Sequence, residues 1–367
     1  MKPIINLVVL LFTLNSFAQK NMDTIYGNPK SVKENVQFLN KDKQNYKYMY
    51  YDGDYGHSTI FHPIYIKNRF YRFWYREINC FYINYEKKFK KNGKAKNEVW
   101  YNKDGSIERK YEYNYEKSSI LKTTKEYYYD NEFLFQKYYY DEENRLIASI
   151  KNYSEDPNEF YHSYFDRDNN GNIIKSTSFN ENGSSVSTFR IYNNKDKLMR
   201  TVRSIPNKWR NNEHINDETI FDSLEIRRNI KKFEYDKNEN LILESSYNED
   251  NKVSRKTTYK YNNNNLIERT SYGNPKNTSS YFKTIYKYNE QNLRIKEDKI
   301  YSGKIEKSTS TIYDDKNFIV QIKIEEKNKN YIIDYKYKFD EKGNWVKITK
   351  IVNSEPLFEW TRKIKYY

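Results

Sequence analysis

The sequence predicts an all-β fold: an antiparallel β-meander of strand–turn repeats that forms an elongated curved sheet with a cap at each end. Three observations support this prediction. An apolar residue recurs at a nearly constant spacing, and apolar and polar side chains alternate in the segments between these residues. Aromatic residues are also abundant, with 40 Tyr and 20 Phe in 367 residues. Aromatic rings pack well on the half-buried surface of a strand, so this composition favours strands over helices.

The repeat is marked by an apolar residue that usually follows Asn or another turn residue. The markers are Leu146, Ile173, Leu198, Leu241, Leu266, Leu293, Phe318 and Trp345. Successive markers are 27, 25, 43, 25, 27, 25 and 27 residues apart, and an aromatic residue followed by Asp or Asn precedes most of them, as in Tyr235-Asp236. A fixed period of this kind indicates a repeat architecture. Upstream, Ile107, Ile120 and Phe133 lie 13 residues apart, so each repeat contains two strand–turn units.

One repeat shows the predicted strands directly. Residues 241–247 form a mostly apolar segment, residues 248–251 are turn formers, and residues 253–261 alternate regularly. One face of the alternating segment carries Val253, Arg255, Thr257, Tyr259 and Tyr261. The other face carries Ser254, Lys256, Thr258 and Lys260. This period of two predicts an antiparallel strand with one packed face and one solvated face.

The N-terminus has the pattern of a secretory signal peptide over residues 1–18. Lys2 precedes the apolar run 4–14, and Ser16 and Ala18 occupy the small-residue positions of a cleavage site. The run is too short to span a bilayer, which needs about 20 apolar residues. We therefore expect an exported protein with no membrane span, located in the periplasm or at the cell surface, or secreted.

The predicted domain organisation follows from the repeat. Residues 19–100 form an aromatic-rich N-terminal capping region, and residues 101–367 form the repeat array. The 43-residue step places an insertion at about residues 203–228, with a short helix predicted over residues 213–228. Insertions in repeat proteins often lie on one face and carry recognition residues, but for this segment the favoured interpretation is a plain surface loop.

The repeat units resemble the YD repeats of the Rhs family, whose signature is close to Tyr-Xaa-Tyr-Asp-Xaa-Xaa-Gly-Asn-Leu. Residues 337–345 and 233–241 are the nearest copies, and the resemblance covers about residues 100–367. It implies long β-sheets that spiral into shells around toxins or form adhesion modules at the cell surface. The array is short for a closed shell and carries no visible toxin domain. The resemblance therefore implies a short exported member without a toxin.

Two segments supply the candidate ligand-binding residues. Residues 70–76 are predicted to form a strand in a region where aromatic and basic residues crowd together, and the insertion carries a Trp-Arg pair. Exposed rings beside cations could bind a sugar or a peptide, whereas buried rings would cap the first repeat. The candidates are Arg72, Trp74, Tyr75, Arg76, Trp209 and Arg210.

No catalytic residue, cofactor site or metal site is predicted. Residues 166–173 resemble the start of a calcium loop, but Thr177 stands where a bidentate Glu is needed, so we interpret this segment as a repeat turn. The Asp and His residues within 52–62 match no standard spacing, and their role stays open. The single cysteine, Cys80, allows no intramolecular disulfide and is expected to be buried.

Charge and composition suggest the class of function. The net charge is +15, but the basic residues are mostly interleaved with acidic ones, which favours loose attraction to polyanions. We expect a non-enzymatic binding or structural protein that contacts envelope polysaccharide or a protein partner, with no nucleic acid and an undetermined oligomeric state. The alternatives are a toxin-neutralising or assembly protein that pairs through a sheet edge and, less favoured, a glycan-active enzyme.

Overall fold

The described part of the protein is built from antiparallel strands and the turns between them. The computed structural model describes residues 24–39, 70, 74, 75, 78, 80, 82–102, 104–116, 120–128, 131–153, 160–181, 185–206, 225–248, 250–274, 276, 278–327 and 329–367. Its strands are β1 (Pro29–Phe38), β2 (Asn84–Phe89), β3 (Ala95–Tyr101), β4 (Ile107–Glu116), β5 (Ile120–Tyr128), β6 (Asn131–Tyr140), β7 (Leu146–Tyr153), β8 (Phe160–Arg167), β9 (Ile173–Asn180), β10 (Ser185–Tyr192), β11 (Leu198–Pro206), β12 (Glu225–Tyr235), β13 (Leu241–Tyr247), β14 (Val253–Asn262), β15 (Asn265–Tyr272), β16 (Tyr281–Tyr288), β17 (Arg294–Tyr301), β18 (Lys304–Tyr313), β19 (Ile319–Glu326), β20 (Lys329–Phe339), β21 (Trp345–Val352) and β22 (Glu355–Tyr366).

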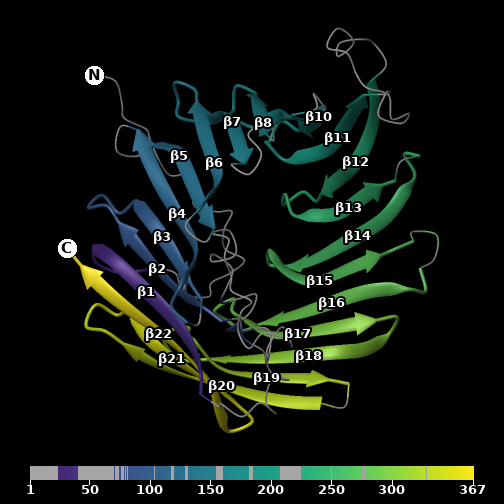
Figure 1. Cartoon of the computed structure of the whole chain (residues 1–367). Coiled ribbons are helices and arrows are strands. Elements are labelled where there is room, and N and C mark those ends of the chain that lie inside the picture. The colour runs from purple at the N-terminus through teal and green to yellow at the C-terminus, as the bar shows by residue number, and fades with distance from the viewer. Residues whose placement is uncertain are drawn as a thin grey trace, which may run out of the picture.

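The 22 strands form one closed sheet, in which each strand pairs with its neighbours in the chain (Figure 1). The first strand closes the ring, because β1 pairs with β2 on one side and with β22 on the other. The prediction of an all-β antiparallel meander is confirmed, but the elongated sheet with a cap at each end is wrong. Its two end strands would have exposed unpaired backbone groups, and closure pairs those groups instead.

The marker residues of the repeat lie at the start of strands or directly before them, and a tight turn precedes each one. In the turn after β20, the Asp340 backbone N–H donates to the carbonyl of Asn344, and Gly343 has a φ of 79°. The Asp340 carboxylate accepts the backbone N–H groups of Lys342 and Asn344 at 3.0 and 2.8 Å. This geometry is a three-residue hairpin loop that ends in a left-handed residue. The same arrangement recurs at residues 236–240 and explains the Asp in the motif.

The aromatic residue before the turn ties one repeat to the previous one. The Tyr288 hydroxyl donates to the carbonyl of Leu266 at 2.9 Å, and the Tyr313 hydroxyl donates to that of Arg294 at 2.9 Å. Equivalent bonds are made by Tyr140, Tyr192, Tyr235 and Tyr337. Apart from Leu121, which accepts the bond of Tyr140, the acceptors are repeat markers or the residues directly after them. The spacing in the sequence therefore reflects a hydrogen bond that recurs around the ring.

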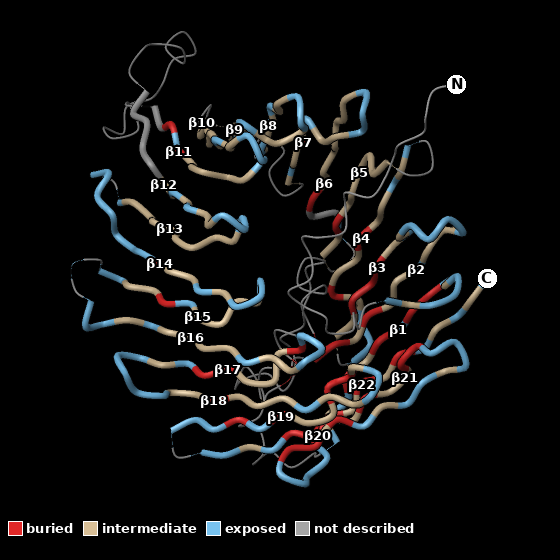
Figure 2. The backbone as a smooth tube through the Cα atoms, turned by 180° about the vertical axis from the view of Figure 1, so that it is seen from behind, coloured by how far each residue is buried: buried red, intermediate tan, exposed pale blue. Residues whose placement is uncertain are grey.

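The hydrophobic core lies on one face of the sheet and in one part of the ring. We call this face the inner face and define it as the one against which Phe70, Trp74 and Tyr75 pack. Phe70 stacks on Trp360 of β22 with ring centroids 4.4 Å apart, and Tyr75 meets Tyr335 of β20 at 5.1 Å. Figure 2 shows buried backbone concentrated in β19–β22 and β1–β4, with little in β7–β10. The core therefore supports the part of the ring where it closes.

Two local predictions are corrected by the backbone. Phe70, Trp74 and Tyr75 belong to no strand, and the Tyr75 N–H donates to the Phe70 carbonyl at 2.8 Å. The helix predicted over residues 213–228 is wrong at its end, because residues 225–228 are part of β12. The rest of that helix lies outside the described residues, as does most of the predicted insertion.

Candidate functional site

The inner face of β16–β19 carries rows of charged and hydroxyl side chains. One row crosses the strands through Thr284, Lys299, Lys307 and Glu326, which are direct register partners in turn. The next row crosses through Tyr286, Glu297, Thr309 and Ile324. Direct cross-strand neighbours have Cβ atoms about 5 Å apart, so side chains in a row can act together.

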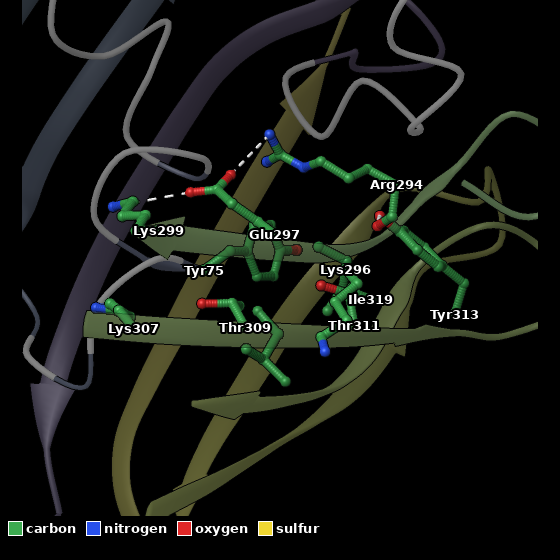
Figure 3. Close-up of a pocket in the computed structure, with 11 residues that line it drawn as sticks. Tyr75, Arg294, Lys296, Glu297, Lys299, Lys307, Thr309, Thr311, Tyr313 and Ile319 are labelled. Atoms are coloured by element: carbon green, nitrogen blue, oxygen red, sulfur yellow. Dashed lines mark hydrogen bonds and ion pairs between the residues drawn. The ribbon is translucent and has the colours of Figure 1, made fainter. Parts of the chain in front are cut away.

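A cavity of about 60 Å³ lies against these rows (Figure 3). By volume it accommodates a few water molecules or one small charged group, not a whole sugar ring. Its lining residues are Tyr75, Arg294, Lys296, Glu297, Lys299, Lys307, Thr309, Thr311, Tyr313, Ile319 and Ile322. Arg294, Lys299 and Lys307 are cations on the face that carries Glu297, the one acidic lining residue, whereas the ammonium of Lys296 lies 3.4 Å from Asp298 on the opposite face of β17. The cavity therefore has a modest excess of positive charge.

Glu297 organises two of the cations. Its carboxylate lies 2.9 Å from Arg294 Nη1 and 3.7 Å from Lys299 Nζ, and its side chain is 10% exposed. A register shift in the pairing of β16 and β17, between Lys287 and Tyr288, accompanies the Arg294 contact with Glu297. Bulges of this kind re-aim a side chain, which brings a residue from the end of the turn onto the inner face.

Lysine side chains keep the site in contact with solvent. Lys299 is 49% exposed and Lys307 is 16% exposed, and the Lys307 ammonium lies 3.6 Å from Glu326. Thr309 and Thr311 follow Lys307 along β18 and also line the cavity. Neither hydroxyl makes a hydrogen bond within the described part of the chain. Ammonium groups beside free hydroxyls offer donors suited to a carboxylate or phosphate.

Two tyrosines, Tyr75 and Tyr313, also line the cavity. The Tyr75 and Tyr337 hydroxyls lie 3.0 Å apart, and Tyr337 also donates to the Ile319 carbonyl at 2.7 Å. Burial raises the pKa of Tyr313 to about 12, opposed by the nearby Arg294 guanidinium. Tyr313 is therefore protonated near neutral pH and serves as a hydrogen-bond donor to the backbone, not as a proton-transfer group.

The structure buries the two predicted ligand-binding rings that it describes. Trp74 is 1% exposed and Tyr75 is 4% exposed, and Trp74 packs on Trp360 with centroids 5.0 Å apart. The expectation that both rings form an exposed platform is corrected, because packing among aromatic residues removes them from solvent. Tyr75 nevertheless reaches the cavity from the inside.

The other predicted positions cannot be placed. Arg72, Arg76, Trp209 and Arg210 lie outside the described residues, as does the Asp and His cluster at residues 52–62. The residues that do gather around the cavity, above all Lys299 and Lys307, were not predicted from the sequence. The only sign of them in the sequence is the alternation of side chains along each strand, which every repeat shows. The cross-strand register decides which of these side chains meet.

Other possible chemistry is limited within the described part of the chain. There, no group of three or more His, Cys, Asp or Glu side chains could hold a metal ion. The predicted turn at residues 166–173 is confirmed: the Gly171 N–H donates to the Asp168 carbonyl at 3.0 Å. Cys80 is buried, as expected, and burial raises the pKa of its thiol to about 12, partly offset by Lys350. None of the helical segments described is both long and apolar enough to cross a bilayer.

Comparison with known proteins finds structural likeness only. No family model matches the sequence, and no curated protein matches it. Solved structures with similar folds include a TcdB2-TccC3-TEV complex, with 11% identity and a TM-score of 0.41 over 76% of this chain and 15% of the other. A Tc holotoxin pore from Photorhabdus luminescens gives 11% identity and a TM-score of 0.40 over 75% of this chain and 15% of the other.

A porin-like protein from Bacteroides uniformis gives 8% identity and a TM-score of 0.26, over 92% of this chain and 98% of the other. The chain spans about one seventh of the length of the Tc toxin chains that it matches. All of these scores are low, so they support no statement about function. The likeness to YD repeats therefore remains a resemblance carried by the motif.

Proposed function

We propose that this chain is a non-enzymatic binding protein that acts outside the cytoplasm and binds an anionic envelope polysaccharide on the inner face of β16–β19. The observation that carries the proposal is the cavity of Figure 3, where Arg294, Lys299, Lys307 and two threonine hydroxyls line the same face as the single carboxylate of Glu297. Export rests on the signal-peptide pattern of residues 1–18.

The arrangement suits binding better than catalysis. Glu297 is held by Arg294 and Lys299, so its negative charge is balanced by two cations. The closed sheet fixes the strands that carry the cations, and a rigid frame lowers the entropy lost when a ligand binds. A carboxylate of the ligand would replace water beside Lys299 and Lys307.

The alternative of edge pairing with a toxin or an assembly partner loses its structural basis. Each of the 22 described strands already has two neighbours, so none of them offers a free edge. A protein partner would have to bind a face or a turn instead. A glycan-active enzyme remains an alternative, which the same binding experiment addresses.

The test measures binding of residues 19–367 to an acidic polysaccharide and to a neutral one across a salt series. The variant Lys299→Gln with Lys307→Gln removes the two lysines of the site. The matched control, Lys323→Gln with Lys336→Gln, removes two lysines from exposed positions on β19 and β20. Hydrogen bonds to charged groups contribute about 1.5 kcal/mol or more each, so we expect at least a ten-fold loss in the site variant.

The control variant should bind like the unmodified protein. Equal losses of affinity in both variants would show that binding depends only on net charge, and the proposed site would then be wrong. Chromatography of the polysaccharide after incubation addresses the enzyme alternative, since shortened chains would show turnover. No binding of either polysaccharide at low salt would overturn the proposed function itself.

A further inference from the structure

Two aromatic rings stand exposed at the end of the charged rows. Phe282 on β16 and Tyr301 on β17 are direct register partners, with ring centroids 4.7 Å apart. Phe282 is 66% exposed and Tyr301 is 41% exposed. A single exposed apolar residue is ordinary, but an adjacent group of large ones marks a surface used for contact.

These rings continue the rows that lead to the cavity. Phe282 lies two residues before Thr284 on β16, and Tyr301 lies two residues after Lys299 on β17. Residues two apart on a strand share a face and are separated by about 6.7 Å. The pair Phe282–Tyr301 is therefore the row directly outside the row that contains Lys299 and Lys307.

The geometry points to a sugar-stacking subsite at Phe282 and Tyr301, and to a polysaccharide of uronic-acid residues as the ligand. This inference rests on the proposed function, because it extends the same site outward. A sugar ring would pack its C–H face on the exposed rings, and its carboxylate would reach Lys299 and Lys307 one row further in. Specific small-molecule sites commonly combine aromatic surface with a few placed polar groups in this way.

The relative orientation of the rings favours a sugar over a nucleic-acid base. The planes of Phe282 and Tyr301 are inclined by 38°, so they form an angled surface and not a parallel slot for a flat base. The Tyr301 hydroxyl lies 3.3 Å from the Ser280 hydroxyl, which places two groups able to hydrogen-bond a sugar hydroxyl beside the rings. A puckered ring with axial C–H groups and hydroxyls matches such a surface.

The experiment uses four ligands that separate charge from ring shape. An oligogalacturonate has both sugar rings and carboxylates, whereas its methyl ester keeps the rings and loses the charge. Inorganic polyphosphate has charge without rings, and a single-stranded oligonucleotide has charge with flat bases. Each is titrated into residues 19–367 and into the double variant Phe282→Ala with Tyr301→Ala. Tyr301→Phe serves as a variant that keeps the ring, and Ile312→Ala removes an apolar side chain that is 53% exposed on β18.

We expect the double ring variant to bind oligogalacturonate at least about ten-fold more weakly and to bind polyphosphate unchanged. Tyr301→Phe and Ile312→Ala should stay close to the unmodified protein, and urea unfolding checks that all variants are folded. The Lys299→Gln, Lys307→Gln variant should lose affinity for both charged ligands.

Oligogalacturonate binding that ignores the rings while still requiring the lysines would overturn this inference and leave the proposed function standing. Failure of every anionic ligand to bind the unmodified protein would overturn both. An oligonucleotide that binds as tightly as oligogalacturonate, with the same dependence on the rings, would overturn the assignment of a sugar ligand.

Discussion

Single hydroxyl groups account for much of the repeat's sequence signature. The tyrosine before each turn could be replaced by phenylalanine if it served only as a packed ring. The structure gives it a second task, because the Tyr288 hydroxyl reaches back to the Leu266 carbonyl and satisfies a backbone acceptor of the previous repeat. Burial raises the pKa of Tyr288, which keeps the hydroxyl protonated as a donor. Tyr288 thus contributes through its oxygen as well as through its ring.

Removing that oxygen should cost stability at one repeat. We expect Tyr288→Phe to lower the free energy of unfolding by about 0.5–1.5 kcal/mol, because one hydrogen bond is lost and a backbone carbonyl is left partly buried without it. Urea unfolding measures the difference. Tyr247→Phe is the control, since the Tyr247 hydroxyl has no hydrogen bond in the described structure; an equal loss in both variants would contradict the assigned role.

At the scale of the element, the turn fixes the spacing between strands. Each turn needs one residue with positive φ, and the chain fills that position with Gly at residue 343 and with Asn at residue 317. Asp at the first position binds the turn's backbone N–H groups. Hydrogen bonds of this kind hold the pKa of Asp236 below its ordinary value, and the largest effect comes from the Asn240 backbone N–H. Desolvation acts in the opposite direction. The contribution of this carboxylate is therefore present above its unfolded pKa and is lost as the pH falls through the folded one.

The glycine of the turn should be replaceable only at a cost. Gly343 has a φ of 79° and open space where a Cβ atom would lie, so Gly343→Ala tests backbone strain alone. We expect a loss of about 1 kcal/mol, because a left-handed backbone is unfavourable for any residue with a Cβ. Thermal unfolding measures it. Gly273→Ala meets equally open space without a positive φ and should cause no such loss; if it matched Gly343→Ala, strain would not be the cause.

At the scale of the whole molecule, a buried ion pair holds the ring closed. Glu34 on β1 accepts hydrogen bonds from Arg362 and Trp360 on β22, with the Arg362 Nη2 atom 2.7 Å from the carboxylate. Both charged side chains are at most 1% exposed. A buried pair contributes modestly to stability, but it penalises any arrangement that separates its members. It therefore specifies which two strands meet at closure.

Breaking this pair should destabilise the whole ring. We expect Glu34→Gln to lower the free energy of unfolding by about 3–5 kcal/mol, because Arg362 stays buried opposite a neutral group. The readout is the urea midpoint together with the hydrodynamic radius, which should rise if the ring opens. Glu325→Gln, in an exposed pair with Lys323, should leave both nearly unchanged. A Glu34→Gln protein as stable as the original would show that closure depends on the hydrophobic core alone.

The sequence by itself determined the strand–turn unit, its antiparallel pairing and the repeat period marked from Leu146 to Trp345, because these depend on local alternation and turn chemistry. It could not show that the ring closes, since closure joins residues such as Glu34 and Arg362 that are more than 300 positions apart. It also could not show that Trp74 is buried or that Lys299 faces Lys307. Cross-strand register and packing decide those contacts, and only the tertiary structure contains them.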